Sequence, residues 1–364
     1  MQRPSANPHI EALRAYIPGE QPEGAGWIKL NTNEHPWPPS AQAVAAARVV
    51  LQDDAAGLRL YPSPDASPLR VAASRLHGHP AAEIVAGNGS DDLLNLLIRA
   101  FAGPGRPVAF LDPSYSLYPV LAGAQNAPVL RVPFPTDGRL TPALLRDSKA
   151  ALFILTNPNA PLGHAFTPVE IERAAADFPG LLVVDEAYAA FADADCAALP
   201  RQLANVVVTR TLSKSHALAG LRAGYALCPP GVADILHRLR DSYNLDVVAQ
   251  VAAAAALGDT VWLQQAVKDV RAARLQLTQG LEALGWKVRP SQGNFVLTFP
   301  SRPGVEPSAK VSEEVLGFLR ARRILVRRFP AHALTEAGLR ISVGRPDAMQ
   351  ALLAAAADWT AGRG

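Results

Sequence analysis

The stretch ALFILTNPNAPLGHAFTPVEIERAAADFPGLLVVDEAY, residues 151–188, decides the fold class. It contains two short runs, 151–155 and 181–184, that are apolar at every position rather than at alternate positions. Between them, residues 168–178 have the apolar spacing of an amphipathic helix. Strands that are apolar on both faces and joined by helices are typical of a parallel sheet covered on both sides. The stretch therefore predicts a strand–helix–strand unit of an α/β fold.

Apolar runs of the same kind surround this unit and extend the predicted sheet. They lie at 83–90, 107–115, 205–214 and 223–230. A long amphipathic helix, 259–285, then leads into a segment that predicts a smaller α+β domain. Its expected strands lie within 287–300, 324–330 and 338–344, and its expected helices near 307–322 and 347–360. We therefore divide the chain into an N-terminal arm (1–40), a large domain with a mainly parallel sheet between helices (41–258), and a linking helix with a small domain (259–364).

Composition narrows the class of protein. The chain has 364 residues, a formal net charge of +3 and only two cysteines. This small excess of basic residues forms no long block, so we expect neither nucleic acid nor an anionic membrane as a partner. No metal-binding spacing of Cys and His occurs, and the N-terminal residues lack a signal-peptide pattern. We expect a cytoplasmic protein without a metal.

Polar residues follow several of the predicted strands at the point where each strand ends. Asn159, Asp185 and Lys214 occupy such positions, and Ser90 and Tyr115 come after two further apolar runs. In open α/β sheets, ligands bind in the crevice outside the carboxyl ends of the strands. These five residues are therefore expected to converge on one site.

The first candidate element is a phosphate-binding turn. In GNGSDDLLNLL (87–97), Ser90 is a good N-cap, and the free N–H groups of the first helical turn can hold a phosphate. Asp91 and Asp92 would repel that phosphate unless their side chains point away. The alternative is a capped helix without a ligand.

Asp185 and Lys214 are the two candidates for chemistry. An aspartate at the end of a buried strand needs a cation or several donors, so Asp185 suits a protonated ring nitrogen, a metal, or a structural cap or ion pair. Lys214 lies among small and apolar residues, where desolvation lowers the pKa of an amine and frees it to attack a carbonyl. Arg222 and Ser213 stand near it and suit a phosphate. The alternative is a lysine that only reaches the surface. A phosphate site, a ring-nitrogen partner and a low-pKa lysine together meet the needs of pyridoxal phosphate.

Many segments of the chain resemble one known family, in that family's order and spacing. They are ALRAYIPGE (12–20), KLNTNEHPWPPS (29–40), LRLYPSPDASPLR (58–70), GNGSDD (87–92), DPSYSLYP (112–119), NPNAPLG (157–163), VVDEAYAAF (183–191), TLSKSHALAGLRAGY (211–225), YNLDVVAQ (243–250), SQGNFVL (291–297) and LRISVG (339–344). The lysine and DEAY segments resemble fold-type I pyridoxal-phosphate aminotransferases. The chain as a whole is similar to the histidinol-phosphate aminotransferase family.

The resemblance implies a role for each matching cofactor residue. Lys214 would form the aldimine with pyridoxal 5′-phosphate and then move a proton between substrate and cofactor. Asp185 would keep the pyridine nitrogen protonated, and Tyr188 would hydrogen-bond the phenolic oxygen. The full implied cofactor set is Gly89, Ser90, Asp91, Tyr115, Asn159, Asp185, Tyr188, Ser213, Arg222 and Tyr61.

The resemblance also implies partners and substrate contacts. Tyr61 would reach the cofactor phosphate of the partner subunit, which implies a homodimer with shared active sites. Arg340 would bind the carboxylate of the amino donor. Arg327, with Tyr16 from the partner's arm, would bind a substrate phosphate. Strand alternation sends only one of Arg327 and Arg328 inward, and we favour Arg327.

The implied reaction is a ping-pong transamination. Glutamate and 2-oxoglutarate would form one substrate pair and histidinol phosphate the other, in histidine biosynthesis. Two alternatives keep the fold: an aromatic amino-acid aminotransferase and a phosphothreonine decarboxylase. A third is a non-catalytic binding protein, against which the joint presence of Lys214, Asp185 and Arg222 argues.

Three departures from the family pattern bear on the site. Ala160 stands where the family has an asparagine that donates to the phenolic oxygen. We expect Tyr188 alone to hold that oxygen, unless Asn159 or a water takes the missing place. Asp246 stands where a neutral residue is commoner, which would make the substrate surface more acidic. His35 and Trp37 replace commoner residues in NEHPWPPS, which loosens the substrate assignment.

Overall fold

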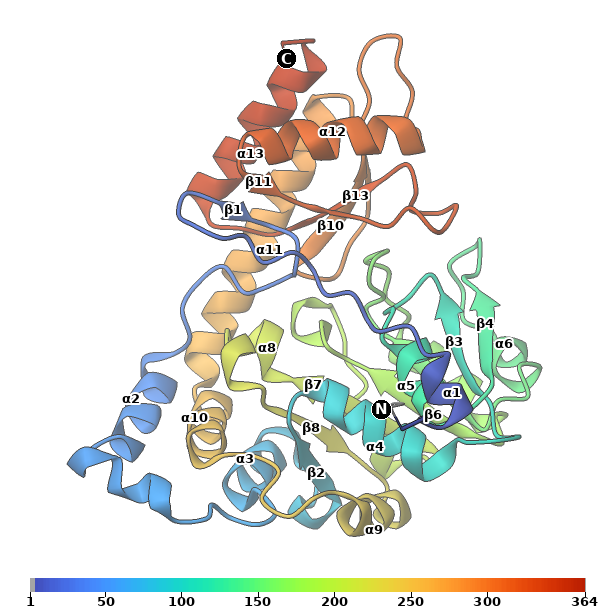
Figure 1. Cartoon of the computed structure of the whole chain (residues 1–364), viewed down its shortest axis with the longest axis vertical. Helices are drawn as coiled ribbons and strands as arrows, with labels where there is room; N and C mark the ends of the chain where they lie inside the picture. Colours follow the sequence, from blue (N-terminus) through green and yellow to red (C-terminus); the bar gives the residue numbers. More distant parts are fainter. Residues whose placement is uncertain (1–3, 364) are drawn as a thin grey trace.

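The computed structural model describes residues 4–363, so the ends of the expected arm and small domain, 1–3 and 364, lie outside the described residues. The large domain is built on a seven-stranded sheet (Figure 1). Its order is β2-β8-β7-β6-β5-β3-β4, and β8 alone runs antiparallel to its neighbours. The strands are β2 (Ile84–Gly87), β3 (Val108–Asp112), β4 (Val129–Pro133), β5 (Leu152–Thr156), β6 (Leu181–Asp185), β7 (Val206–Thr211) and β8 (Gly224–Leu227). The predicted α/β fold class is confirmed.

Helices cover both faces of this sheet because its strands are apolar on both sides. In β5, Phe153 and Leu155 pack into one apolar cluster while Ile154 packs into the other. The helices of the first face are α2 (Ala41–Val50), α3 (Ser67–His77), α6 (Pro142–Arg146), α7 (Pro168–Ala176) and α10 (Val247–Gly258). The helices of the second face are α4 (Ser90–Phe101), α5 (Tyr118–Ala124) and α9 (Pro230–Leu239). The central strands are therefore fully enclosed.

Short helices complete the large domain. They are α8 (Leu212–Ser215) and the 3-10 turns η1 (Asp53–Arg59), η2 (Ala81–Glu83), η3 (Ala189–Phe191), η4 (Leu199–Arg201) and η5 (Ala219–Leu221). The α8 turn follows β7 directly and therefore lies at the carboxyl end of a central strand.

The small domain is joined to the large one by α11 (Thr260–Ala283), the long helix that its sequence predicts (Figure 1). Its antiparallel sheet has the order β12-β13-β10-β9. The remaining elements are β9 (Lys287–Arg289), β10 (Phe295–Phe299), α12 (Ala309–Ala321), β11 (Ile324–Leu325), β12 (Arg327–Arg328), β13 (Leu339–Ser342) and α13 (Pro346–Thr360). Side chains from α11, α12, α13 and the sheet form a separate apolar core.

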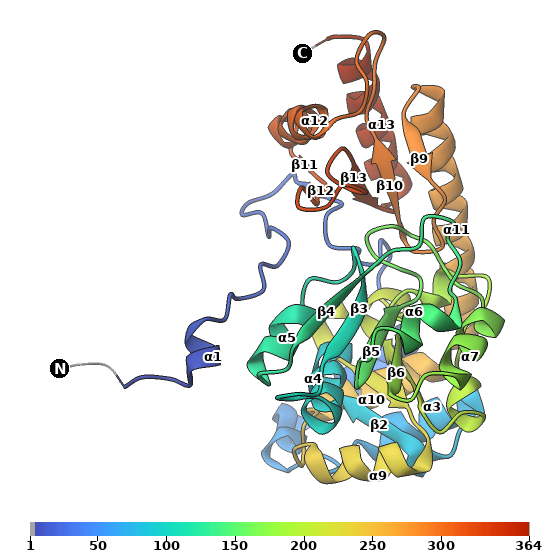
Figure 2. The same ribbon diagram turned by 90° about the vertical axis from the view of Figure 1, so that its right-hand side faces the viewer.

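The N-terminal arm connects the two domains. Helix α1 (Pro8–Glu11) lies beside α5 on the outside of the large domain (Figure 2). Further along, β1 (Ile28–Lys29) pairs in parallel with β11, and Leu30 is buried in the small-domain core. Residues 28–30 thus belong structurally to the small domain, although they precede the large one in sequence.

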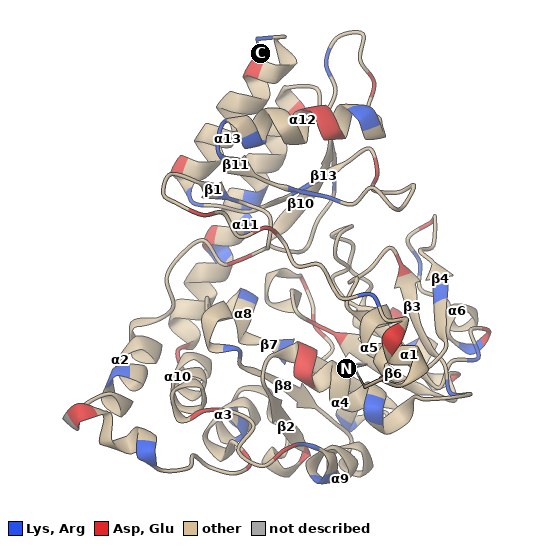
Figure 3. Cartoon of the chain, viewed as in Figure 1, with Lys and Arg blue, Asp and Glu red and all other residues tan. Residues whose placement is uncertain are grey.

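The distribution of charged residues and the length of the apolar helices bear on what a nucleic-acid-binding or membrane protein would need. Basic and acidic residues are interspersed along both domains rather than separated (Figure 3). Within residues 4–363, no single helix is long and apolar enough to cross a membrane. Helices α10 and α11 reach the required length and composition only together, and the chain bends by 77° between them.

Candidate active site

A cavity of about 280 Å³ lies where the carboxyl ends of the large-domain strands meet the small domain and the arm. Most of the predicted site residues line it. They are Tyr16, Ser90, Asp91, Tyr115, Asp185, Tyr188, Ser213, Lys214, Arg222, Arg327 and Arg340. Residues that come from β6, from α4 and α8, from the small domain and from the arm thus meet in one pocket.

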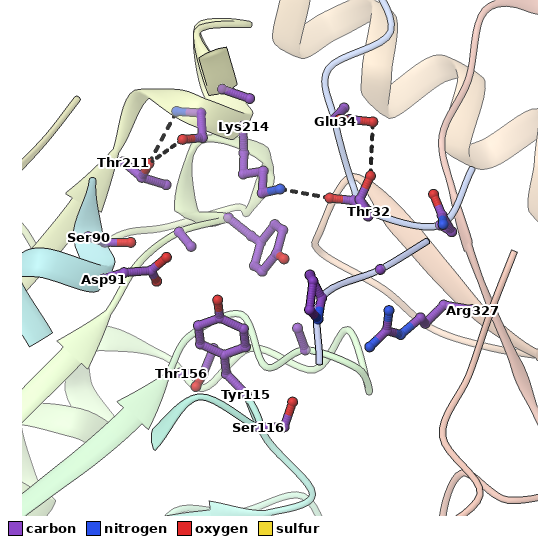
Figure 4. A pocket seen from close by; sticks show the side chains of 18 of the residues that line it. Thr32, Glu34, Ser90, Asp91, Tyr115, Ser116, Thr156, Thr211, Lys214 and Arg327 are labelled. Carbon is purple, nitrogen blue, oxygen red and sulfur yellow. Dashed lines mark hydrogen bonds between the residues drawn. The ribbon is translucent and has the colours of Figure 1, made fainter. Parts of the chain in front are cut away.

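Lys214 projects into this pocket from α8 (Figure 4). Its Nζ donates a hydrogen bond of 2.8 Å to the backbone oxygen of Thr32. Burial lowers the pKa of the Lys214 amine to about 8, and the nearby Arg340 guanidinium acts in the same direction. A substantial fraction of this amine is therefore neutral near pH 7 to 8, which is what attack on a carbonyl requires.

One end of the pocket is an anion-binding cradle. Ser90 begins α4, a helix of twelve residues whose N-cap is Gly89, and Ser90 and Asp91 of its first turn line the cavity. The first N–H groups of a helix can hold an anion. Arg222 Nη1 donates to Ser213 Oγ at 3.2 Å. Gly89 has a φ of +84°, which favours glycine, and a Cβ at this position would lie 2.8 Å from Arg222 Nη2, so the end of the arginine would have to move. Backbone N–H groups, hydroxyls and a guanidinium are suitable donors for a phosphate.

The two acidic residues of this cradle have different partners. The Asp91 carboxylate lies 3.5 Å from Arg222 Nη2, and burial raises the pKa of Asp91. Asp92 turns back and accepts a hydrogen bond from the Asn88 N–H at 2.9 Å. The expected repulsion of a phosphate is thereby reduced, because one carboxylate points away and the other pairs with a cation.

Asp185 lies at the other end of the pocket, on the last residue of β6. The Tyr118 hydroxyl donates to its Oδ2 at 2.6 Å, and Tyr118 also contacts the Thr156 hydroxyl at 2.5 Å. Burial raises the pKa of Asp185 to about 6, against the effect of the Tyr118 hydrogen bond. A cation in contact would favour the charged carboxylate. Glu186 points the opposite way and pairs with Arg210 at 2.6 Å.

Aromatic hydroxyls and rings form the wall between these ends. Tyr188 follows β6 and accepts a hydrogen bond of 3.0 Å from Asn33 Nδ2. Tyr115 lines the pocket with its ring 5.7 Å from that of Tyr16, edge to face. A flat ring bound between Lys214 and Asp185 would therefore meet aromatic side chains.

Two arginines enter the pocket from the small domain. Arg340, on β13, is buried and donates to the Asn31 backbone oxygen at 2.7 Å, and burial lowers its pKa to about 10. Its Nε has no hydrogen-bond partner among the described residues. Arg327, on β12, also lines the pocket, whereas Arg328 turns to the Ser312 hydroxyl on α12. The structure thus places Arg327 on the pocket side.

Three expectations need correction, and a fourth stays a prediction. Asn159 does not line the pocket, because its amide donates to the Pro113 oxygen and accepts from the Leu162 N–H. Tyr16 lines the pocket of its own chain, and its expected contribution to a partner's site stays a prediction. Asp246 caps α10 through the Ala249 N–H and is not a pocket residue. His35 and Trp37 pack together and lie outside the pocket lining, with ring centroids 5.8 Å apart.

Tyr61, the expected contributor to a partner's site, does not line this pocket. It is 82% exposed and stacks on Tyr243, with ring centroids 4.6 Å apart.

Several pocket residues were not predicted from the sequence. Asn31, Thr32 and Glu34 of the arm line the cavity, as do Thr156 and Thr211 at strand ends. The Thr211 hydroxyl donates to Ser213 Oγ at 2.9 Å, so it orients part of the anion cradle. A signal for the two threonines was present, because both close an apolar strand whose neighbour carries a predicted site residue.

Comparison with known proteins defines the class. The family model described as Aminotransferase class I and II matches residues 25–356. The histidinol-phosphate aminotransferase of Geobacter sulfurreducens is 45% identical over 95% of this chain and 97% of its own length. The enzyme of the same name from Syntrophotalea carbinolica is 44% identical over 96% of this chain and 98% of its own.

A solved structure gives the same assignment. Histidinol-phosphate aminotransferase from Sinorhizobium meliloti, crystallised in complex with pyridoxal 5′-phosphate, superposes with a TM-score of 0.85 at 26% identity. The match covers 99% of this chain and 98% of that one. The fold and site thus define a pyridoxal-phosphate-dependent aminotransferase. Within that class, the chain belongs to the histidinol-phosphate aminotransferase family.

The pocket residues fit this cofactor. Pyridoxal phosphate has a phosphate, an aldehyde carbon and a pyridine nitrogen, and the pocket offers an anion cradle, a buried amine of lowered pKa and a buried carboxylate. Asp185 has a raised pKa and no basic side chain bonded to it within the described part of the chain. A protonated ring nitrogen supplies the positive charge that this carboxylate lacks.

Proposed function

We propose that this chain transfers the amino group of histidinol phosphate to 2-oxoglutarate, a step of histidine biosynthesis, in two half-reactions at one site. The observation that carries the proposal is the joint placement of Lys214, Asp185 and two arginines around one cavity. The names of the relatives, matched over nearly the whole chain, support the choice of substrate.

The cofactor roles follow the chemistry of the pocket residues. Ser90, Ser213 and Arg222 would hold the cofactor phosphate, and Asp185 would face the pyridine nitrogen. Tyr188 would donate to the phenolic oxygen. When bound in this way, pyridoxal phosphate serves as the electron sink for a carbanion at the substrate Cα.

Lys214 would perform the proton transfer. Its neutral Nζ would remove the proton from the substrate Cα and deliver a proton to the cofactor carbon C4′, and it would do the reverse in the second half-reaction. The pKa of about 8 suits both directions, because a base whose pKa is near the working pH gives and takes a proton with similar ease.

Arg340 and Arg327 would bind the substrate anions. The buried Arg340 would bind the carboxylate of glutamate, since a guanidinium fork matches a carboxylate in two directions. Arg327, which is more exposed and lies near Tyr16 in the pocket wall, would bind the phosphate of histidinol phosphate. Two separate anion sites allow one pocket to serve both half-reactions.

We further propose a cytoplasmic homodimer with shared active sites. The arm at α1 lies on the outside of the large domain (Figure 2), and apolar side chains are exposed beside Tyr61. These are Leu51, Leu58 and Leu60, each more than half exposed. A second copy of the chain would cover them and bring Tyr61 to the partner's cofactor phosphate.

The test begins with the visible spectrum of the purified protein loaded with pyridoxal phosphate. Addition of histidinol phosphate should bleach the visible band, and 2-oxoglutarate should restore it. A band that ignores histidinol phosphate but bleaches with an aromatic amino acid would contradict the proposed substrate. Release of CO₂ without any dependence on a keto acid would contradict transamination and favour a decarboxylase.

A further inference from the structure

The cofactor's phenolic oxygen has fewer possible donors here than the family pattern supplies. Ala160 occupies the position of the missing amide, and its methyl group lines the pocket and packs in one cluster with Tyr188. The neighbouring Asn159 does not replace it, because both ends of its amide bond to backbone groups. Among the residues assigned to this oxygen, Tyr188 is the donor that remains.

Asn33 fixes where that proton points. Its Nδ2 donates to the Tyr188 oxygen at 3.0 Å, so this side of the hydroxyl acts as an acceptor. The hydroxyl has a single proton, which must then point away from Asn33. Since Tyr188 lines the cavity, its remaining directions include the pocket interior.

The amide of Asn33 is itself held in one orientation. The Ser342 hydroxyl accepts from the Asn33 N–H at 2.9 Å and donates to Asn33 Oδ1 at 2.9 Å. If the amide were flipped, Ser342 would receive two donors and its own proton would lose its acceptor. Asn294 Nδ2 donates to the Asn33 backbone oxygen at 3.0 Å and anchors the residue further.

The backbone of Asn33 also favours this residue type. Its φ is +54°, in the left-handed region that asparagine tolerates better than most side chains, and only 1% of its surface is exposed. Burial raises the pKa of Tyr188, while Arg340 and the hydrogen bond from Asn33 oppose this rise. Asn33 thus acts on both the direction and the acidity of the Tyr188 hydroxyl.

We propose that Asn33 is a positioning residue, which fixes Tyr188 as the hydrogen-bond donor to the cofactor's phenolic oxygen. The proposal rests on the assigned cofactor and on the role proposed for Tyr188, but not on the identity of the amino substrate. A donor withdraws electron density from the phenolic oxygen and weakens its hold on the proton that the visible band reports. Loss of the donor should therefore raise the pH midpoint of that band.

The experiment is a pH titration of the visible absorbance of the holoenzyme without substrate. Asn33→Gly removes the amide and still permits the positive φ, so the fold should be retained. We expect its midpoint to rise by about one pH unit, a tenfold change in proton affinity. Asn33→Asp should raise it at least as far, because a carboxylate would accept the Tyr188 proton and turn it from the pocket.

Two further variants separate positioning from general disturbance. In a Tyr188→Phe background, Asn33→Gly should shift the midpoint by less than about 0.2 unit, because the group that it positions is absent. Ala160→Asn should restore the midpoint of Asn33→Gly by supplying the missing amide. Asn205→Ala is the control outside the pocket, since its amide donates to the Ala175 and Phe178 backbone oxygens, and it should leave the midpoint unchanged.

The proposal is overturned if Asn33→Gly keeps the wild-type midpoint, or if it shifts the midpoint equally with and without Tyr188. Turnover of histidinol phosphate by the unaltered holoenzyme is measured separately. Absence of turnover would refute the proposed substrate, whereas the pH titration alone tests the proposed role of Asn33.

Discussion

Lys214 Nζ donates to the backbone oxygen of Thr32 across 182 residues of sequence. The residues on either side of Thr32 make similar contacts: Asn31 accepts from Arg340 and Asn33 donates to Tyr188. Three consecutive residues of the arm thus each touch a different functional side chain. This segment continues from β1, which pairs with β11 of the small domain. The small domain therefore fixes the position of the arm residues that contact Lys214 and Tyr188 of the large domain.

This contact gives a prediction for the protein without its cofactor. The pKa of Lys214 is lowered to about 8, and only the neutral amine attacks an aldehyde. The rate at which the protein captures added pyridoxal phosphate should therefore rise about tenfold for each unit by which the pH is increased toward 8. Above that pH the rate should level off. Stopped-flow absorbance at a series of pH values measures the rate. A rate that is constant between pH 6 and 9 would contradict the lowered pKa, and Lys214→Arg is the control that should not react.

A second prediction concerns the ring-nitrogen end of the pocket. Asp185→Asn should lower kcat by about 10²–10³-fold, because a neutral amide cannot stabilise a protonated ring. Tyr118→Phe keeps the carboxylate and removes its 2.6 Å donor, so the pKa of Asp185 should rise further above about 6. When the pH is lowered, the variant should therefore begin to lose cofactor affinity at a higher pH than the wild type does. An unchanged pH profile would show that this hydrogen bond does not tune the carboxylate.

Much of the large domain can be predicted from the sequence, because its central strands begin with runs of apolar residues and are separated by helical patterns. The edge strand β4 was not predicted, because it is only partly buried and includes Arg131. Residues 324–330 read as one strand, yet they form β11 and β12, which pair with different partners. Two-residue strands such as these depend on tertiary pairing and leave little periodicity to read.

The site divides in the same way. Lys214 and Asp185 can be predicted because each polar residue ends an apolar strand, where the fold places its ligands. Thr32 lies 182 residues from Lys214 in the sequence, and Asn33 lies 155 residues from Tyr188. A local sequence pattern therefore cannot predict these contacts. Asn159 misleads for the converse reason: it stands at a strand end, but the turn there uses its amide to satisfy backbone groups.

A third prediction separates the two adjacent arginines. Arg327→Ala should raise the KM for histidinol phosphate by about 10- to 100-fold, the effect of losing a charged hydrogen bond. It should change the KM for glutamate much less, because Arg340 is the residue proposed to bind that carboxylate. Arg328→Ala is the matched control, since its guanidinium bonds to α12. Equal effects of both variants on both substrates would contradict a dedicated phosphate site.

A fourth prediction tests the missing amide directly. Ala160→Asn in the otherwise unaltered chain adds a donor beside Tyr188 in the pocket wall. The pH midpoint of the visible band should fall by about one unit, because the phenolic oxygen would then receive two donors. The same absorbance titration measures it, with Ala160→Ser as a smaller polar control. An unchanged midpoint would mean that Tyr188 is not the sole donor in the wild type.

The fifth prediction asks whether active sites are shared between subunits. Lys214→Ala should be inactive, and Tyr61→Ala should bind the cofactor weakly if Tyr61 serves the partner's phosphate. When the two variants are unfolded and refolded together, half of the dimers are mixed, and each contains one site with both residues intact. Activity should therefore return to about a quarter of the wild-type value. Activity no higher than the mean of the two separate variants would show that Tyr61 does not act across a dimer, and sedimentation of the mixture would establish that dimers had formed.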